Sequence, residues 1–244
     1  MAEEQGMVAK YFGDAHRGCG QSFVKNLAAA VHHRLPREIR NYVYSYCVQS
    51  DYDDDVIVRR RADPYGAMVL LVRDSLGPYS YRWIEDPITS FIKASILGNE
   101  VAREMLEIYY RVRKFKIAHR DLPLVEAFLK TDTFHLDISP ALYVRRLEID
   151  IEVEAGEVQH QEAAGSPEED VGLQAIQALS ANIRGCTDVA VAFCHDDQSP
   201  CHSARGRDRV AFDDVVSPRL LQAVESLRNE RPRARIVYRR TWRD

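Results

Sequence analysis

Helical spacing of apolar residues marks the first half of the chain, and alternation of apolar and polar residues marks its last third. Apolar residues that recur every three or four positions predict helices at residues 21–34, 35–48, 88–97, 100–112 and 122–129. Short apolar runs at residues 56–58 and 67–72 lie on either side of a turn, which predicts a hairpin or two neighbouring strands. Residues 114–118 predict one more short strand.

The last third has the pattern of a parallel sheet. Aliphatic residues alternate with acidic ones along residues 147–154, which is typical of a strand with one buried face. Residues 189–193 are apolar on both faces, so we expect a central strand there. Helices at 171–183 and 220–227 and a strand at 234–238 complete a strand-helix-strand-helix-strand order, which favours parallel crossovers. The sequence therefore predicts an α/β (or α+β) fold with N-terminal helices, a short hairpin and a C-terminal parallel sheet.

Length and composition limit the class of protein. With 244 residues, 45% of them hydrophobic, the chain can bury a substantial core. We expect residues 1–20 to be a mobile arm and residues 21–244 a single α/β domain, with a sub-boundary near 155–167 as the alternative. Five cysteines without framework spacing indicate a reduced intracellular protein, cytoplasmic or nuclear, and we recognise neither a targeting sequence nor a membrane span. The net charge of -4 argues against non-specific coating of nucleic acid.

The second predicted helix opens with the residues Leu-Pro-Arg-Glu-Ile-Arg at positions 35–40. Pro36 suits the first position of a helix, and Glu38 suits its positive first turn. This Leu-Pro-x-Glu-Ile opening resembles the first helix of an F-box. It is more closely similar to the opening of many uncharacterised proteins of filamentous fungi, and the segments 98–104 and 128–132 extend that resemblance over roughly residues 35–150.

The F-box resemblance implies an interaction or adaptor protein, for which a Skp1-type protein is one expected partner. We expect the contacts to come from the second helix, through Leu35, Pro36, Glu38, Ile39, Tyr42 and Val43. Leu35, Ile39, Val43 and Cys47 recur at helical spacing, so the pattern predicts that this side is buried; if it is exposed instead, it is a docking surface. The predicted hairpin at 56–72 stands where a full F-box continues with further helices.

Two Cys-His pairs make residues 194–202 a candidate ligand loop, with the residues Cys194, His195, Asp197, Cys201 and His202. Thiolates and imidazoles are good zinc ligands, and Cys194 ends the predicted central strand, where open parallel sheets hold ligands. The spacing matches no recognised zinc finger or ribbon, and a catalytic cysteine is a further alternative. We favour an ordinary mobile loop, with no bound metal and no cofactor.

The acidic residues at 148–154 need cations opposite them, because like charges on one strand face repel each other. We expect these cations to be Arg59 and Arg61, or Arg235 and Arg239, which would form a structural charge ladder. Acid-base chemistry or Mg²⁺ binding by the paired acids is the alternative. The arginine-rich C-terminal strand has two interpretations of its own, a charged edge strand and an RNA-binding surface.

An enzyme is the alternative function. Small fungal proteins without recognisable domains include tRNA-dependent cyclodipeptide synthases that use arginyl-tRNA, and the size and arginine-rich end of this chain are compatible with that family. The resemblance implies tRNA as a partner. The Asp-Asp-x-x-Glu motif of the family is absent, and the chain contains no P-loop, dinucleotide-binding, serine-hydrolase or His-Glu-x-x-His motif, so the catalytic residues and the oligomeric state stay undetermined.

Overall fold

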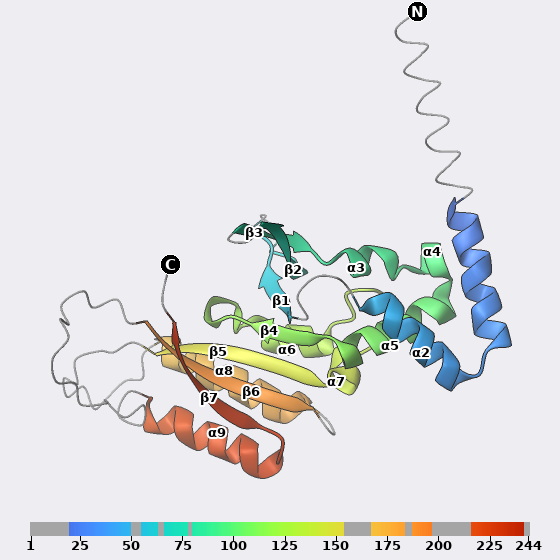
Figure 1. Ribbon diagram of the computed structural model, residues 1–244. Helices are drawn as coiled ribbons and strands as arrows, with labels where there is room; N and C mark the ends of the chain where they lie inside the picture. Colours follow the sequence, from blue (N-terminus) through green and yellow to red (C-terminus); the bar gives the residue numbers. More distant parts are fainter. Residues whose placement is uncertain are drawn as a thin grey trace, which may run out of the picture.

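A single sheet organises the molecule (Figure 1). The computed structural model describes residues 20–49, 55–62, 66–77, 80–153, 167–183, 187–196 and 216–241. Its strands are β1 (Asp55–Arg60), β2 (Met68–Gly77), β3 (Ser80–Glu85), β4 (Lys114–Ile117), β5 (Arg146–Val153), β6 (Asp188–Asp196) and β7 (Arg235–Thr241). They pair in the order β3-β2-β1-β4-β5-β6-β7, in which β1 and β4 to β7 are parallel and the β1–β2 and β2–β3 pairs are antiparallel. The predicted α/β class with a parallel C-terminal sheet is therefore confirmed.

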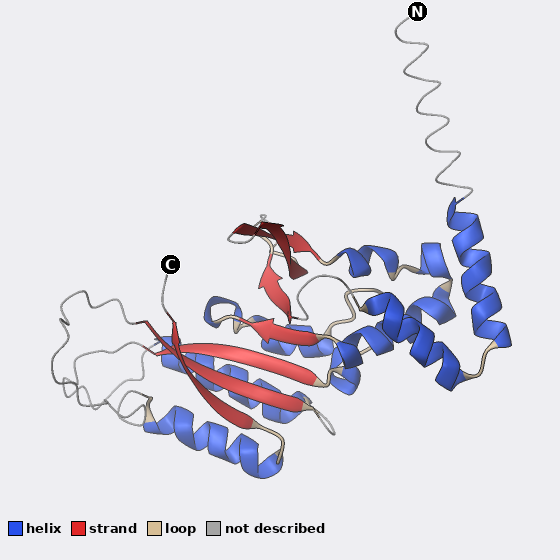
Figure 2. Ribbon diagram, in the orientation of Figure 1, coloured by secondary structure: helices blue, strands red, loops and turns tan. Residues whose placement is uncertain are grey.

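Helices connect the strands (Figure 2). A first helix covers residues 20–34. It is followed by α2 (Arg37–Val48), α3 (Pro87–Phe91), α4 (Ala94–Leu97), α5 (Asn99–Val112), α6 (Leu124–Lys130), α7 (Pro140–Tyr143), α8 (Pro167–Asn182) and α9 (Pro218–Glu230). Among the described residues, none of the helices combines the length and the apolarity needed to cross a membrane.

The alternation along β5 places one face of the sheet against helices. The aliphatic residues of this strand are buried, namely Leu147, Ile149, Ile151 and Val153. A Cβ added to Gly172 of α8 would lie 3.3 Å from Leu220 Cδ2 and 3.4 Å from Ile151 Cγ2, so α8 packs tightly on both β5 and α9. In Figure 1, α6 and α8 lie behind the strands. Residues 189–193 of β6 are all buried between β5 and β7, which confirms the predicted central strand.

The hairpin predicted at 56–72 exists, but a third strand that the sequence did not indicate extends it. β3 is an edge strand that is exposed along most of its length, so it lacks the alternation of a half-buried strand. Its residues Tyr81 and Trp83 remain partly exposed, and the Arg73 guanidinium lies 3.9 Å from the centre of the Tyr81 ring. The helix predicted at 88–97 is also divided into α3 and α4, which are separated by Ile92 and the extended residue Lys93.

Four aromatic rings of the core come together where α5, β4 and α6 meet. The ring of Phe115 lies 5.7 Å from Tyr109, 5.6 Å from Tyr110 and 5.1 Å from Phe128, between ring centroids. Edge-to-face and tilted contacts at these distances are favourable beyond the area that they bury. The predicted arm (residues 1–20) and the predicted sub-boundary near 155–167 lie outside the described residues, apart from Gly20, which begins the first helix, and Pro167, which begins α8.

Candidate functional site

The helix α2 is oriented opposite to the sequence prediction. Its buried residues are Tyr44, which is 2% exposed, and Val48. The residues expected to be buried are exposed instead: Ile39 is 50% exposed, and Tyr42 and Tyr46 beside it are 62% and 59% exposed. Cys47 is exposed as well. The prediction that Ile39 and Cys47 are buried is therefore wrong, whereas Leu35 and Val43 of the same stripe are half-buried. The buried side of α2 carries Tyr44 and Val48 together with arginines that pair with α5.

Glu104 of α5 is the centre of that interface. Arg40 donates to both of its carboxylate oxygens, from Nε to Oε2 at 2.9 Å and from Nη2 to Oε1 at 2.8 Å. Arg37 also binds Glu104 and donates to Oε2 of Glu107 at 2.8 Å. His32, from the first helix, approaches with its Nε2 atom 3.4 Å from Glu104 Oε1. We call these residues (His32, Arg37, Arg40, Glu104 and Glu107) the Glu104 clamp.

Arg40 also fixes the first helix. Its Nη1 atom donates to the carbonyl oxygens of His32 at 2.9 Å and Leu35 at 2.8 Å, at the end of that helix. Burial opposes the ionisation of Glu104, but the hydrogen bond from Arg40 and the charges of Arg37 and His32 outweigh it, so the pKa of Glu104 is lowered below its ordinary value. An ionised Glu104 therefore holds the first helix and α2 together on α5.

The opposite side of α2, which we call the outward face, consists of the exposed residues Ile39, Tyr42 and Tyr46. Val43 beside them is half-buried and packs against the core. The two tyrosine rings pack edge to face at 5.0 Å between centroids, and their hydroxyls lie 2.8 Å apart. Of the other residues expected to make contacts, Leu35 is half-buried, as Val43 is, whereas Pro36 and Glu38 are exposed. Two more large apolar residues, Phe23 and Leu27, are exposed on the first helix.

The candidate ligand loop is described only at its beginning. Cys194 and His195 lie near the end of β6, which Asp196 completes, opposite Glu152 and Val153 of β5, and the Cys194 side chain is buried. Asp197, Cys201 and His202 lie outside the described residues. Within the described ranges, no group of three or more His, Cys, Asp or Glu side chains is placed to hold a metal ion.

The acidic side of β5 faces lysines of β4, which the sequence analysis did not name as its cations. Lys114 Nζ lies 3.0 Å from Asp55 Oδ2 and 3.4 Å from Glu148 Oε2, and Lys116 Nζ lies 3.4 Å from Glu148 Oε1 and 2.9 Å from Asp150 Oδ2. Acids and lysines therefore alternate across β1, β4 and β5, which is the geometry of a structural charge ladder.

The predicted arginines have other positions. Arg61 pairs with Glu85 at the end of β3. Arg235 lies on β7, which the whole width of β6 separates from β5. The side chain of Arg239 lies outside what the structure describes. The ladder was thus predicted in kind, but Lys114 and Lys116 were not named among its cations. Arg59 lies on β1, the strand next to β4.

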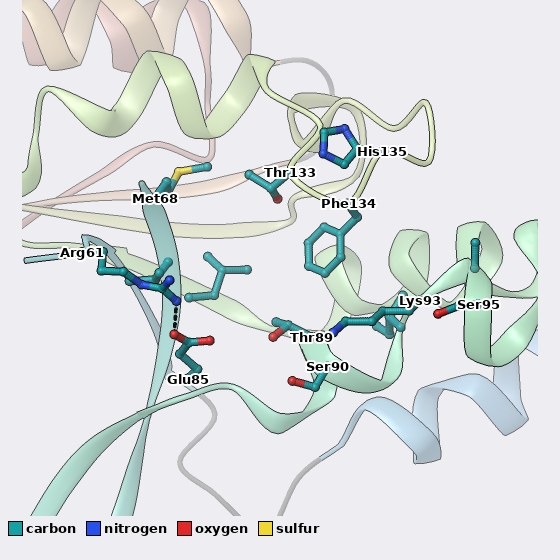
Figure 3. A pocket seen from close by; sticks show the side chains of 14 residues that line it. Arg61, Met68, Glu85, Thr89, Ser90, Lys93, Ser95, Thr133, Phe134 and His135 are labelled. Carbon is teal, nitrogen blue, oxygen red and sulfur yellow. Dashed lines mark hydrogen bonds and ion pairs between the residues drawn. The ribbon is translucent and has the colours of Figure 1, made fainter. Parts of the chain in front are cut away.

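A cleft of about 580 Å³ is the second candidate site. The sequence analysis predicted no binding site at these residues. Figure 3 shows that it is formed by three segments that are distant in the chain: the ends of β1 and β3 with the beginning of β2, the α3–α4 region, and the loop that follows α6. Its polar groups include the Arg61–Glu85 pair, Lys93 and His135. Its volume lies in the range of small-molecule sites.

No protein-family model, curated protein or solved structure matches the chain. Its functional interpretation therefore rests on its own geometry, above all on the outward face of α2 and on the cleft.

Proposed function

We propose that the chain is an intracellular protein of fungal type that acts as an interaction or adaptor protein and docks on a partner through the outward face of α2. The observation that carries this proposal is the exposure of Ile39, Tyr42 and Tyr46 on one helix. They occupy positions i, i+3 and i+7, which belong to the anchor spacing of helices that bind in apolar grooves. Tyrosine is also enriched among the residues that dominate binding energy.

The Glu104 clamp supports this function because it presents the helix rigidly. The charged side of α2 is bound to α5 by Arg37 and Arg40, so the outward face keeps its orientation without help from its own apolar residues. A surface that is ordered before binding loses less conformational entropy when the partner arrives.

The Leu-Pro-x-Glu-Ile opening favours a Skp1-type adaptor as the partner. In this chain α2 is followed by the strands β1 and β2 and not by further helices, so the contacts would have to come from α2 and the first helix. Phe23 and Leu27, both exposed on the first helix, are available to extend the contact.

The experiment is a calorimetric titration of the full chain with a purified fungal Skp1-type protein. We expect binding that a Tyr42→Ala, Tyr46→Ala double variant weakens at least a hundredfold, because a dominant interface residue contributes about 2 kcal/mol or more. Trp83→Ala, which removes an exposed aromatic residue from β3, is the matched control and should bind like the wild type.

Two outcomes would reject the proposal. One is the absence of binding by the wild type; the other is binding that the α2 variant leaves intact. A parallel filter-binding titration with tRNA separates the alternative function, because micromolar tRNA binding without a protein partner would favour the biosynthetic enzyme.

A further inference from the structure

The cleft has two walls that are fixed before any ligand binds. One wall is the loop after α6, in which the Asp132 carboxylate accepts hydrogen bonds from the backbone N–H groups of Phe134 at 3.1 Å and Asp137 at 2.6 Å. His135 and Asp137 adopt positive φ angles of 54° and 56° in this loop. Such backbone conformations cost about 1 kcal/mol or more for a residue with a side chain, and they persist only where the surroundings impose them.

The same loop is anchored from below. Leu136 and Ile138 are buried in the core, and the ring of Phe134 packs edge to face on that of Tyr110 at 6.5 Å between centroids. The loop therefore holds Phe134 and His135 on the upper wall of the cleft, as Figure 3 shows.

The opposite wall depends on Asp86. This buried residue caps α3 by accepting from the Ile88 N–H at 2.9 Å, and it accepts from the Tyr109 hydroxyl, also at 2.9 Å. Arg113, which is buried too, places its Nη2 atom 3.6 Å from the same carboxylate. The position of α3, and with it that of Lys93 at the start of α4, is thus fixed by a buried polar network.

Among the described residues that line the cleft, the ion pairs leave the cation of Lys93 available. Arg61 is paired with Glu85, so these two lining residues neutralise each other. Lys93 has no ion-pair partner among the described residues, and in Figure 3 its side chain extends along the cleft with its ammonium end near Thr89. His135 and Ser90 add further hydrogen-bonding groups to the lining.

The rest of the lining combines polar and apolar residues. Thr89, Ser95 and Thr133 are polar, whereas Met68, Val69, Ile92 and Phe134 contribute aliphatic and aromatic surface. Small-molecule sites combine such apolar surface with polar groups that orient the ligand. Because Lys93 is the one lysine or arginine without an ion-pair partner among the described lining residues, a singly charged head group matches it better than a polyphosphate does.

From this arrangement we propose that the cleft binds a small organic carboxylate whose apolar body packs on Phe134 and Met68 while its carboxylate pairs with Lys93. This site is separate from the outward face of α2. It would give the protein a ligand-binding activity that does not depend on the proposed docking function.

The test uses the full chain with two probes, 3-phenylpropionate and octanoate, each compared with its neutral primary amide. Titrations followed by backbone amide chemical shifts give both the affinity and the location of binding. We expect each acid to bind at least about tenfold more tightly than its amide, with shifts in the loop after α6 and in the α3–α4 region; tenfold corresponds to about 1.4 kcal/mol.

Lys93→Met removes the charge but keeps the length of the side chain, and it should abolish the preference for the acid. Lys130→Met is the matched control, because Lys130 is an exposed lysine on α6 that pairs with Glu126 and does not line the cleft. A Tyr42→Ala variant should also bind the probes like the wild type, which separates this proposal from the docking function.

Three results would overturn the inference: no saturable binding of either acid at millimolar concentration, equal affinity for acid and amide, or a preference for the acid that survives Lys93→Met. Shifts that map to a surface outside the cleft would do the same.

Discussion

Replacing Tyr44 by Ala should destabilise the protein several times more than replacing Ile39 by Asp, although both residues belong to α2. Tyr44 is almost fully buried, and truncating a buried aromatic residue to alanine costs about 3–5 kcal/mol. Ile39 keeps half of its surface in water, so its full burial value of about 1.5–3 kcal/mol is only partly realised. An aspartate there would also lie in the positive first turn of the helix. We expect a loss of about 1 kcal/mol for Ile39→Asp.

A third variant tests the same environment more finely. The Tyr44 hydroxyl is buried without a hydrogen-bond partner among the described residues, so the folded protein gains nothing from it and bears its desolvation. Tyr44→Phe should therefore be neutral or stabilise the protein by up to about 1 kcal/mol.

Urea denaturation followed by far-ultraviolet circular dichroism measures all three variants, provided that the slope of the transition is unchanged. The reasoning would be refuted if Ile39→Asp cost about 3 kcal/mol or more, because such a loss requires an uncompensated buried charge. In that case the apolar stripe would face the core, and α2 would have no outward docking surface.

Three further measurements address the charged groups. Tyr109→Phe should cost about 1.5–3 kcal/mol in urea melts, because it removes the buried hydrogen bond to the Asp86 carboxylate, and a loss near zero would contradict that bond. Lys116→Met should cost about 1–3 kcal/mol, since it removes one of the two lysines that face the buried Glu148; a loss no larger than that of an exposed pair, about 0.2–1 kcal/mol, would mean that the ladder is solvated. Because the pKa of Glu104 is lowered in the folded state, its contribution is present above its unfolded pKa and is lost as the pH falls through the folded pKa. Proteolysis at the first helix should therefore accelerate in acid, and a Glu104→Gln variant should be susceptible already at neutral pH and show little further change.

The periodicity of apolar residues was sufficient to predict a strand or helix wherever that element buries its apolar side. The alternation in β5 and the continuous apolar run in β6 each specify one arrangement relative to a helical layer, and both predictions are confirmed. β3 could not be found in this way, because an exposed edge strand has no buried side to produce a pattern.

The cations of the charge ladder show a second limit. The acidic row of β5 predicted that cations must lie opposite it, but sequence alone does not say which strand is its neighbour. Once β4 is placed beside β5, Lys114 and Lys116 fall into register with Arg146 and Glu148. The cleft has the same limitation, since its lining combines segments that are far apart in the sequence.

The reversed orientation of α2 has a physical cause that also bears on function. Predicting that the most apolar side of a helix is buried assumes that the surface beside it is apolar. The surface of α5 instead presents the carboxylates of Glu104 and Glu107. Pairing them with Arg37 and Arg40 avoids leaving a buried carboxylate without a partner, which would cost far more than exposing Ile39. With this orientation the helix leaves Ile39, Tyr42 and Tyr46 in water. Nothing in the described fold requires tyrosines at positions 42 and 46, because the Glu104 clamp would form equally well with polar residues there. A docking partner would explain why these exposed positions carry large aromatic side chains.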